Sequence, residues 1–357
     1  NESAFAKQSL TNNRELQFLL SYISSTFVLP PCRSSFSLSS TGLIHHLENG
    51  FCFPIGGGSE IPYRILPVIE RSGGRVLMKA HVIEILTNGE KVTGVRVQGN
   101  SGVFYIPASV VISDAGVLNT LLDLISQDVA KTSLAWPLTS LIKPSIGCLF
   151  ISMGLKGTPK ELGLPTKNIW IFNNGEDLEK VYSDIYNIKS LEEFVSEPFS
   201  CSLVSSGSAK DPSWEKRYPG RSTLTVLIFV PYFLFSKWSK TKVKKRGEAY
   251  NAIKNKLGKK AAEQLIQLYP NLKNAIDHVS VGTPITMQHF LKAKEGAVFG
   301  LFFSGQDIMS SGIYSTLISG FLCAGAVLKK KFALAFDLYV LHKKIHGKFQ
   351  HLTDLHF

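Results

Sequence analysis

The sequence has 357 residues, of which 44% are hydrophobic and 18% charged, a balance that excludes a disordered chain. The length allows one large domain or two interleaved ones. The formal net charge is +12, yet no zinc-finger spacing, RNA-binding motif or basic heptad helix accompanies it, so we expect no nucleic-acid partner. The five cysteines lack metal-ligand spacing, and the sequence predicts no metal site.

The first predicted elements are helical. Leucine and isoleucine at helical spacing predict a helix over residues 13–24, whereas residues 25–50, rich in Pro, Ser and Gly, predict irregular structure. A second helix is expected to begin after Ser59 as its N-cap and to end at Gly73-Gly74.

Strands and helices then alternate along the chain. An Asn-Gly turn at residues 88–89 separates two strands of a predicted meander. The expected strands are residues 75–78, 81–86, 93–97, 104–106, 110–113, 223–230 and 300–305. The expected later helices are residues 249–268 and an apolar, buried helix from residue 311. The longest apolar run, residues 313–328, is shorter than the ~20 residues that a membrane-spanning helix needs.

The first motif with chemical potential is a glycine cluster, Gly56-Gly57-Gly58, at the start of a predicted helix. Glycines let a backbone approach a ligand closely, and a helix N-terminus favours an anion. A flexible turn before a helix would have the same sequence, and both interpretations stay open.

The second motif is a predicted strand that ends in Gly305-Gln306-Asp307, followed by Gly312 and a helix rich in small residues. The Asp307 carboxylate can accept hydrogen bonds from the hydroxyls of a polyol. A structural role for Asp307 as a helix cap fits the same pattern.

The order of these motifs resembles the phytoene desaturase and carotenoid isomerase family of FAD-dependent oxidoreductases, and within it the retinol-saturase branch. Ser311-Gly312 stands where carotenoid isomerases usually carry Pro-Gly, which favours that branch. The segments that carry the resemblance are residues 11–13, 53–61, 67–74, 208–212, 219–223, 283–288 and 304–323.

The resemblance implies a mixed α/β fold: the C-terminal part of an FAD/NAD(P)-binding, Rossmann-like domain interleaved with a substrate domain. The family's N-terminal βαβ unit, with its Gly-rich turn, is expected to be absent, and a family segment before Leu301 is missing as well. The implied segments are a substrate-domain segment (1–50), an FAD-domain segment (51–116), the substrate domain (117–290) and a C-terminal FAD-domain segment with a tail (291–357).

The resemblance also assigns cofactor contacts, although no catalytic acid or base follows from it. Val82 would contact the adenine side of FAD through its backbone. The other implied FAD-binding residues are Gly56, Gly57, Gly305, Gln306, Asp307, Gly312 and Ile313.

The implied reaction is reduction of the 13–14 double bond of all-trans-retinol to 13,14-dihydroretinol. NAD or NADP could be the electron source, but the sequence does not identify the donor. The implied location is the surface of the endoplasmic reticulum membrane, which the basic run of residues 237–246 could contact. Two alternatives stay open: a truncated, non-catalytic paralogue that keeps a retinoid-binding, lipid-binding or membrane-surface role, and a carotenoid isomerase or desaturase. The oligomeric state is not predicted.

Overall fold

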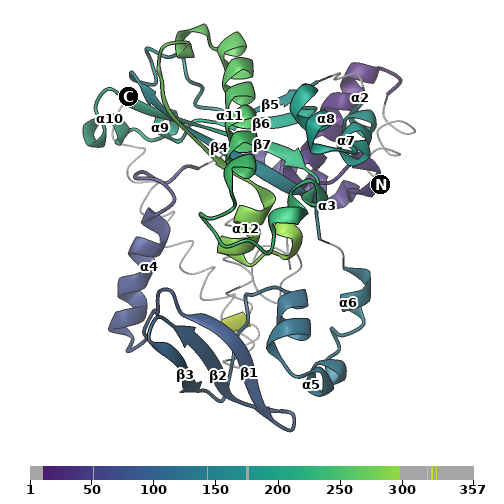
Figure 1. Cartoon of the computed structure of the whole chain (residues 1–357), viewed down its shortest axis with the longest axis vertical. Helices are drawn as coiled ribbons and strands as arrows, with labels where there is room; N and C mark the ends of the chain where they lie inside the picture. The colour runs from purple at the N-terminus through teal and green to yellow at the C-terminus, as the bar shows by residue number, and fades with distance from the viewer. Residues whose placement is uncertain are drawn as a thin grey trace. The chain divides into compact units, whose positions relative to one another are not determined.

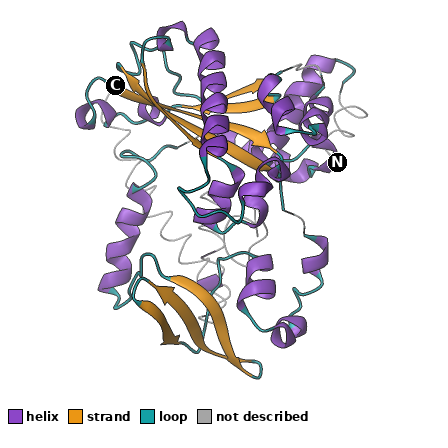
Figure 2. Cartoon of the chain, in the orientation of Figure 1, coloured by secondary structure: helices purple, strands orange, loops and turns teal. Residues whose placement is uncertain are grey.

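The computed structural model describes residues 11–50, 52–142, 144–173 and 177–297, together with residues 320, 323, 324 and 327. These residues form helices and two antiparallel sheets (Figures 1 and 2), which confirms the predicted mixed α/β class. The chain folds as two interleaved compact units: unit 1 is Asn1–Met78 with Pro144–Phe299, and unit 2 is Lys79–Lys143 with Gly300–Phe357. These units are defined by packing alone, so the assignment of segments to an FAD domain and a substrate domain stays a prediction.

Unit 1 is built around a five-stranded sheet with the order β5-β6-β7-β4-β8. Its strands are β4 (Gly147–Lys156), β5 (Ile169–Phe172), β6 (Cys201–Ser205), β7 (Arg221–Val230) and β8 (Ile276–Gly282). Its α-helices are α2 (Arg14–Ser21), α3 (Phe36–Asn49), α4 (Glu60–Arg71), α7 (Leu178–Asn187), α8 (Leu191–Ser196), α9 (Gly207–Lys210), α10 (Trp214–Arg217), α11 (Glu248–Leu268) and α12 (Pro284–Leu291). Its 3₁₀ turns are η2 (Tyr22–Phe27), η3 (Pro31–Arg33), η5 (Tyr232–Trp238), η6 (Pro270–Leu272) and η7 (Lys294–Gly296).

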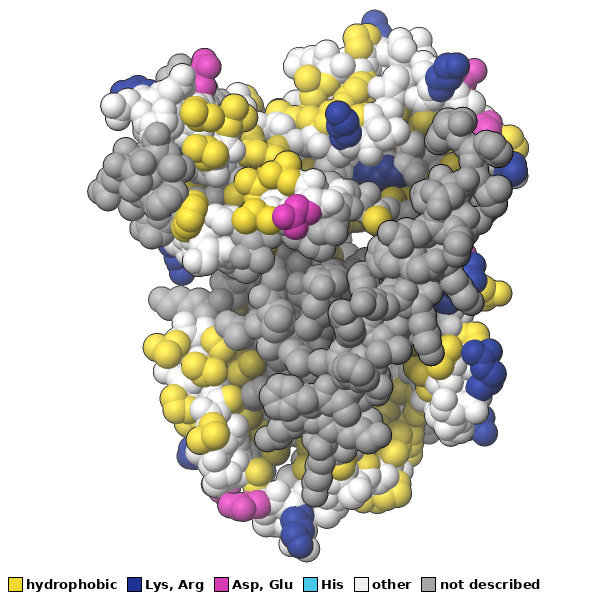
Figure 3. Space-filling view, turned by 180° about the vertical axis from the view of Figure 1, so that it is seen from behind, with side chains coloured by type: hydrophobic (Ala, Val, Ile, Leu, Met, Phe, Trp, Pro, Cys, Tyr) yellow, Lys and Arg dark blue, Asp and Glu magenta, His cyan; other side chains and the backbone are white. Residues whose placement is uncertain are grey.

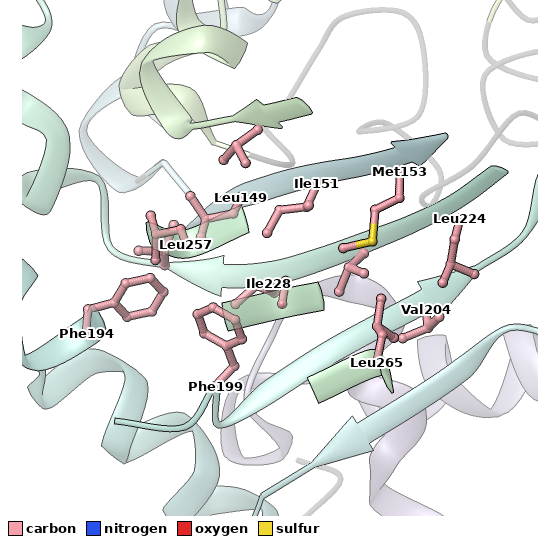
Figure 4. Packing of buried hydrophobic residues seen from close by; sticks show 14 of the residues in the cluster. Leu149, Ile151, Met153, Phe194, Phe199, Val204, Leu224, Ile228, Leu257 and Leu265 are labelled. Atoms are coloured by element: carbon pink, nitrogen blue, oxygen red, sulfur yellow. The ribbon is translucent and has the colours of Figure 1, made fainter. Parts of the chain in front are cut away.

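Alternation along the central strands divides this sheet into two faces. β4 pairs with β7 from Gly147↔Val230 to Lys156↔Arg221, so every second side chain of each strand points the same way. On one face Leu149 and Ile151 pack in the main hydrophobic core with Leu257 and Leu265 of α11 (Figure 4). Because these two leucines and Ala261 recur every four residues, α11 places one continuous apolar stripe on the sheet.

The other face of the sheet is covered over part of its area. Asp177 caps the N-terminus of helix α7, because its side chain accepts a hydrogen bond from the Glu179 N–H at 2.9 Å. Val181 and Tyr182 of this helix pack in a second buried cluster with Cys148 of β4 and with residues of β6 and β7. Outside this cluster, the side chains that point to this face of the sheet are half-buried or exposed.

Unit 2 holds a three-stranded meander in the order β1-β2-β3. Its strands are β1 (His81–Asn88), β2 (Lys91–Gly99) and β3 (Gly102–Pro107), and its helices are η4 (Asn119–Leu124, a π-helix), α5 (Gln127–Thr132) and α6 (Leu138–Leu141). The two-residue turn between β1 and β2 consists of Gly89 and Glu90, one residue later than the predicted Asn-Gly turn, and Gly89 has φ +59°. Val117, Leu121 and Ala130 form a small buried cluster.

Three predictions of local structure are wrong. Residues 25–50 are not irregular throughout, because no proline interrupts residues 36–49 and Gly50, with φ +67°, ends helix α3. The predicted strands at residues 75–78 and 110–113 pair with no other strand within the described residues. The extended backbone of residues 75–78 ends at Lys79, which has φ +54°. The strand and helix expected after residue 300 lie outside the described residues.

The contact between α11 and the sheet predicts a large loss of stability for Leu257→Ala. Leu257 is 0% exposed, so truncation removes buried apolar surface and leaves a cavity that costs about 2–5 kcal/mol. Leu268→Ala is the matched control, because Leu268 lies on the same helix and is 52% exposed. Urea unfolding measures both variants, and equal losses would contradict this account of the core.

Candidate functional site

The glycine cluster forms a tight turn that leads into helix α4. Gly56 and Gly57 have φ values of +95° and +93°, which residues with a Cβ rarely adopt. The Gly57 N–H donates to the Pro54 carbonyl at 2.9 Å, which closes the turn. Ser59 stands at the predicted N-cap position of α4, but its side chain makes no capping hydrogen bond.

A buried carboxylate holds this turn in place. The Gly56 N–H donates to Oδ2 of Asp211 at 3.1 Å, across 155 residues of sequence. The same carboxylate accepts hydrogen bonds from the Ser213 N–H at 2.9 Å and the Ser213 hydroxyl at 2.7 Å, and it pairs with Arg217. The Asp211 side chain is 1% exposed, so these partners replace the water that a carboxylate otherwise needs.

The partners of Asp211 also decide its protonation state. Burial acts to raise the pKa of this carboxyl, but the hydrogen bonds from Ser213, Gly56 and Arg217 outweigh burial and hold the pKa below its usual value. The Arg217 guanidinium itself lies against two aromatic rings, 5.6 Å from the centroid of Trp214 and 5.3 Å from that of Tyr218. The site therefore contains an ionised carboxylate at neutral pH.

Two buried serines fasten the adjacent helix α9 to the start of strand β7. The Ser206 hydroxyl donates to the Thr223 carbonyl at 2.8 Å, and the Thr223 N–H donates to the Ser208 hydroxyl oxygen at 2.9 Å. Ser206 also caps α9 by accepting from the Ala209 N–H at 3.2 Å. Asp211, which follows α9 directly, is thereby fixed relative to the sheet.

Lys210 lies between the glycine turn and the sheet. Its ammonium donates to the Asn168 side-chain oxygen and to the Ser205 hydroxyl at 2.6 Å, and it lies 5.9 Å from the centre of the Phe53 ring. Burial lowers the pKa of Lys210 from its usual value. This side chain thus connects residue 53 with the last residue of β6.

The open face of the five-stranded sheet carries two parallel rows of side chains. Strand register places Ser205, Thr225, Ser152 and Ser280 in one row across β6, β7, β4 and β8, which we call the hydroxyl row. The neighbouring row across β6, β7 and β4, which we call the apolar row, consists of Leu203, Leu227 and Phe150. Cys148, in the row beyond the apolar one, is buried, and burial raises the pKa of its thiol to about 12.

The structure describes three of the eight predicted cofactor residues. Gly56 and Gly57 lie in the turn held by Asp211, and Val82 lies in β1 of unit 2, opposite Val97 and beside a bulge. Gly305, Gln306, Asp307, Gly312 and Ile313 lie outside the described residues. The cofactor role of all eight residues stays a prediction.

Residues that the sequence did not identify complete this site. Three separate segments that carry the family resemblance, residues 53–61, 208–212 and 219–223, meet here through Asp211 and Ser208. The order Asp211-Pro212-Ser213 was the available signal, because an aspartate commonly accepts from the N–H two residues later in an Asx turn. The hydroxyl row had no such signal, since it depends on the register of four strands.

Two other kinds of site do not occur among the described residues, a metal site and a membrane-spanning helix. Among the described residues, no group of three or more His, Cys, Asp or Glu side chains is arranged to hold a metal ion. No helix in the same part of the chain combines the length and apolar character needed to cross a membrane.

The lowered pKa of Asp211 predicts a pH-dependent contribution to stability. Above the ordinary carboxyl pKa of about 4, wild type should exceed Asp211→Asn by about 1.5–3 kcal/mol, because hydrogen bonds to the charged carboxylate are lost. A depressed pKa in the folded state means that this difference shrinks as the pH falls below about 4. Urea midpoints at several pH values measure it.

The control for this experiment is Asp184→Asn, which removes an equal charge from an exposed position on α7. We expect Asp184→Asn to change the free energy of unfolding by less than about 0.5 kcal/mol. A stability difference for Asp211→Asn that grows on acidification would contradict the assignment of an ionised, hydrogen-bonded carboxylate.

Comparison with known proteins reveals close relatives by sequence. The chain is 34% identical over 355 residues to an all-trans-retinol 13,14-reductase of Danio rerio, covering 92% of this chain and 58% of that protein. It is 29% identical to an inactive all-trans-retinol 13,14-reductase of the same organism, over 96% of this chain and 59% of the relative. The chain thus spans about three fifths of the length of these relatives.

A solved structure supports the fold at lower sequence identity. The crystal structure of an oxidoreductase from Methanosarcina mazei matches with a TM-score of 0.50 and 13% identity, covering 78% of this chain and 55% of that one. No protein-family model matches the chain. On the strength of its sequence relatives, the chain belongs to the family of the all-trans-retinol 13,14-reductases.

Proposed function

We propose that the protein is an FAD-dependent oxidoreductase that saturates the 13–14 double bond of all-trans-retinol. The observation that carries this proposal is the 34% identity to a retinol reductase over 92% of the chain. Because the chain spans 58% of that relative, the activity of the whole protein remains the proposal to be tested. A relative named as a reductase and a relative named as an inactive reductase both match, so turnover must be measured directly.

The residues around the glycine turn fit a flavin nucleotide. A Cβ built on Gly57 would meet no heavy atom within 4 Å, so a flat or anionic group can approach the backbone there. Val82 lies on the edge strand of its sheet, where the outer backbone groups pair with no other strand among the described residues. Both features support the cofactor contacts that the family resemblance implies.

The protein's own residues would position the reaction, since the bound flavin supplies the hydride chemistry. Gly56 and Gly57 would contact the cofactor from unit 1, and the family resemblance assigns further cofactor contacts to Val82 and to residues 305–307, 312 and 313. Asp211 fixes the turn through the Gly56 N–H. The open sheet face offers a surface of half-buried apolar side chains on which a hydrocarbon chain can lie away from water.

We extend the proposal to the electron source and the location. NADH or NADPH would reduce the flavin. Peripheral contact with the endoplasmic reticulum membrane is supported by a local basic run in which Lys242 and Lys245 are exposed. On the face shown in Figure 3 the described basic side chains are scattered, so the membrane proposal depends on this run.

The central test is turnover of all-trans-retinol by the protein supplied with FAD and NADPH. We expect a product that has lost the 13–14 double bond, seen by its changed absorption and mass. Gly56→Ala should weaken FAD binding by about five- to thirtyfold, because φ +95° costs a residue with a Cβ about 1–2 kcal/mol. The new Cβ would also lie 2.6 Å from Cγ of Glu60.

The matched control for Gly56→Ala is Gly58→Ala, since Gly58 has open space and no positive φ. We expect Gly58→Ala to bind FAD as wild type does. Retinoid binding without flavin binding or turnover would instead support the non-catalytic alternative. Equal FAD affinity of the two variants would contradict the role given to the turn.

The membrane proposal predicts flotation with anionic vesicles at low salt. Lys242→Glu with Lys245→Glu should reduce the floating fraction several-fold, because each basic residue near the lipid contributes about 1 kcal/mol. The control is Lys180→Glu with Lys189→Glu, which makes the same charge change at exposed positions, one within α7 and one just after it. We expect this control to leave the floating fraction nearly unchanged. Binding that persists at about 1 M salt, where the Debye length is about 3 Å, would refute the electrostatic attachment.

A further inference from the structure

We propose that the open face of the five-stranded sheet is the subsite for the alcohol end of the substrate. The apolar row supports the carbon chain, and the Ser152 and Thr225 hydroxyls bind the substrate hydroxyl. This inference rests on the proposed function, which supplies the substrate class. It adds the residues that select an alcohol over a hydrocarbon.

The apolar row is accessible although its side chains are large. Phe150 is 38% exposed, and Leu203 and Leu227 are half-buried, whereas the side chains of β4 on the opposite face are fully buried. Neighbouring strands lie about 4.8 Å apart, so the three side chains extend over about 10 Å across the sheet. That length accommodates several conjugated carbon–carbon bonds lying across the strands.

The hydroxyl row provides unused polar groups directly beside this apolar strip. The half-buried hydroxyls of Ser152 and Thr225 have no hydrogen-bond partner among the described residues, whereas Ser205 already accepts from Lys210. A half-buried hydroxyl without a partner gains free energy when a ligand supplies one. The two side chains sit opposite each other in the register of β4 and β7, two residues along each strand from Phe150 and Leu227.

The geometry of the face selects the occupant. A peptide strand would add to a sheet at its edge, because backbone N–H and C=O groups lie in the plane of the sheet and not on its face. A pure hydrocarbon would use the apolar row and leave the hydroxyls of Ser152 and Thr225 without partners. An elongated apolar molecule with a terminal hydroxyl complements both rows.

The two rows also lie next to the glycine turn within unit 1. The row beyond the hydroxyl row contains Thr223, and a Cβ built on Gly207 would lie 3.9 Å from its Oγ1 and 3.8 Å from Cζ of Phe53. Lys210 bridges the same gap by donating to Ser205 from a position over the Phe53 ring. A substrate hydroxyl at Thr225 would therefore lie on the side of the sheet that the glycine turn adjoins.

The experiment compares two ligands on the purified protein by fluorescence titration. The ligands are all-trans-retinol and the matching polyene hydrocarbon, in which hydrogen replaces the terminal hydroxyl group. Ser152→Ala with Thr225→Val should weaken retinol binding by about fivefold or more, the value of one to two lost hydrogen bonds, and leave hydrocarbon binding unchanged. Phe150→Ser should weaken both ligands alike, because it shortens the apolar row.

The matched control is Thr93→Val, the same chemical change at an exposed strand position of unit 2. It should change neither affinity. Loss of retinol affinity alone in the Ser152 and Thr225 variant supports the subsite. Equal loss for both ligands, no loss for either, or a dimer that excludes retinol from this face would overturn it.

Turnover measured in parallel separates this inference from the proposed function. Wild-type protein that discriminates the two ligands through Ser152 and Thr225 but does not reduce retinol would contradict the proposed activity and leave the subsite intact. If wild-type protein reduces retinol and the Ser152→Ala, Thr225→Val variant does so with the same kinetics, the subsite is contradicted and the proposed activity stands.

Discussion

The hydrogen bond from the Gly56 N–H to Asp211 is the constraint on which the candidate site depends. It joins segments 155 residues apart and does so through a backbone group, so it fixes the path of the chain. A buried carboxylate is costly unless it is fully paired. Asp211 meets this requirement with Ser213 and Arg217, and the glycine turn supplies the remaining donor. Turn and carboxylate therefore stabilise each other.

The central sheet serves two purposes through the alternation of its strands. Leu149 and Ile151 of β4 point into the core beneath α11, while Phe150 and Ser152, which alternate with them along the strand, point to the open face. Substitutions on the two faces should thus be separable, because one set acts on folding and the other on ligands. The same alternation explains why Cys148 is chemically quiet: it lies on the ligand face but beneath the cluster formed with α7, where burial keeps its thiol protonated.

Local periodicity predicted the elements whose side chains repeat regularly. Helix α11 and strand β7 agree with the sequence within two residues, since apolar spacing of four and alternation of two reflect real burial. Helix α3 escaped prediction because its serines and glycine lower helix propensity, and its start and end are set by neighbouring turns. Residues 110–113 carry β-branched side chains but find no partner strand, and a strand is defined by pairing.

The site was harder to predict than the fold because its parts are brought together by register and by distant backbone contacts. Lys210 and Asp211 belong to a segment that carries the family resemblance, yet both have structural roles. Lys210 donates a hydrogen bond to Ser205, and Asp211 accepts one from the Gly56 N–H. A sequence match in that segment therefore indicates that the local structure is kept, and does not by itself indicate that the protein is catalytically active. A relative named as a reductase and a relative named as an inactive reductase accordingly resemble the chain over nearly the same span. If the turn that Asp211 holds binds flavin as proposed, flavin binding at this turn would separate a catalyst from a protein that only binds retinoid.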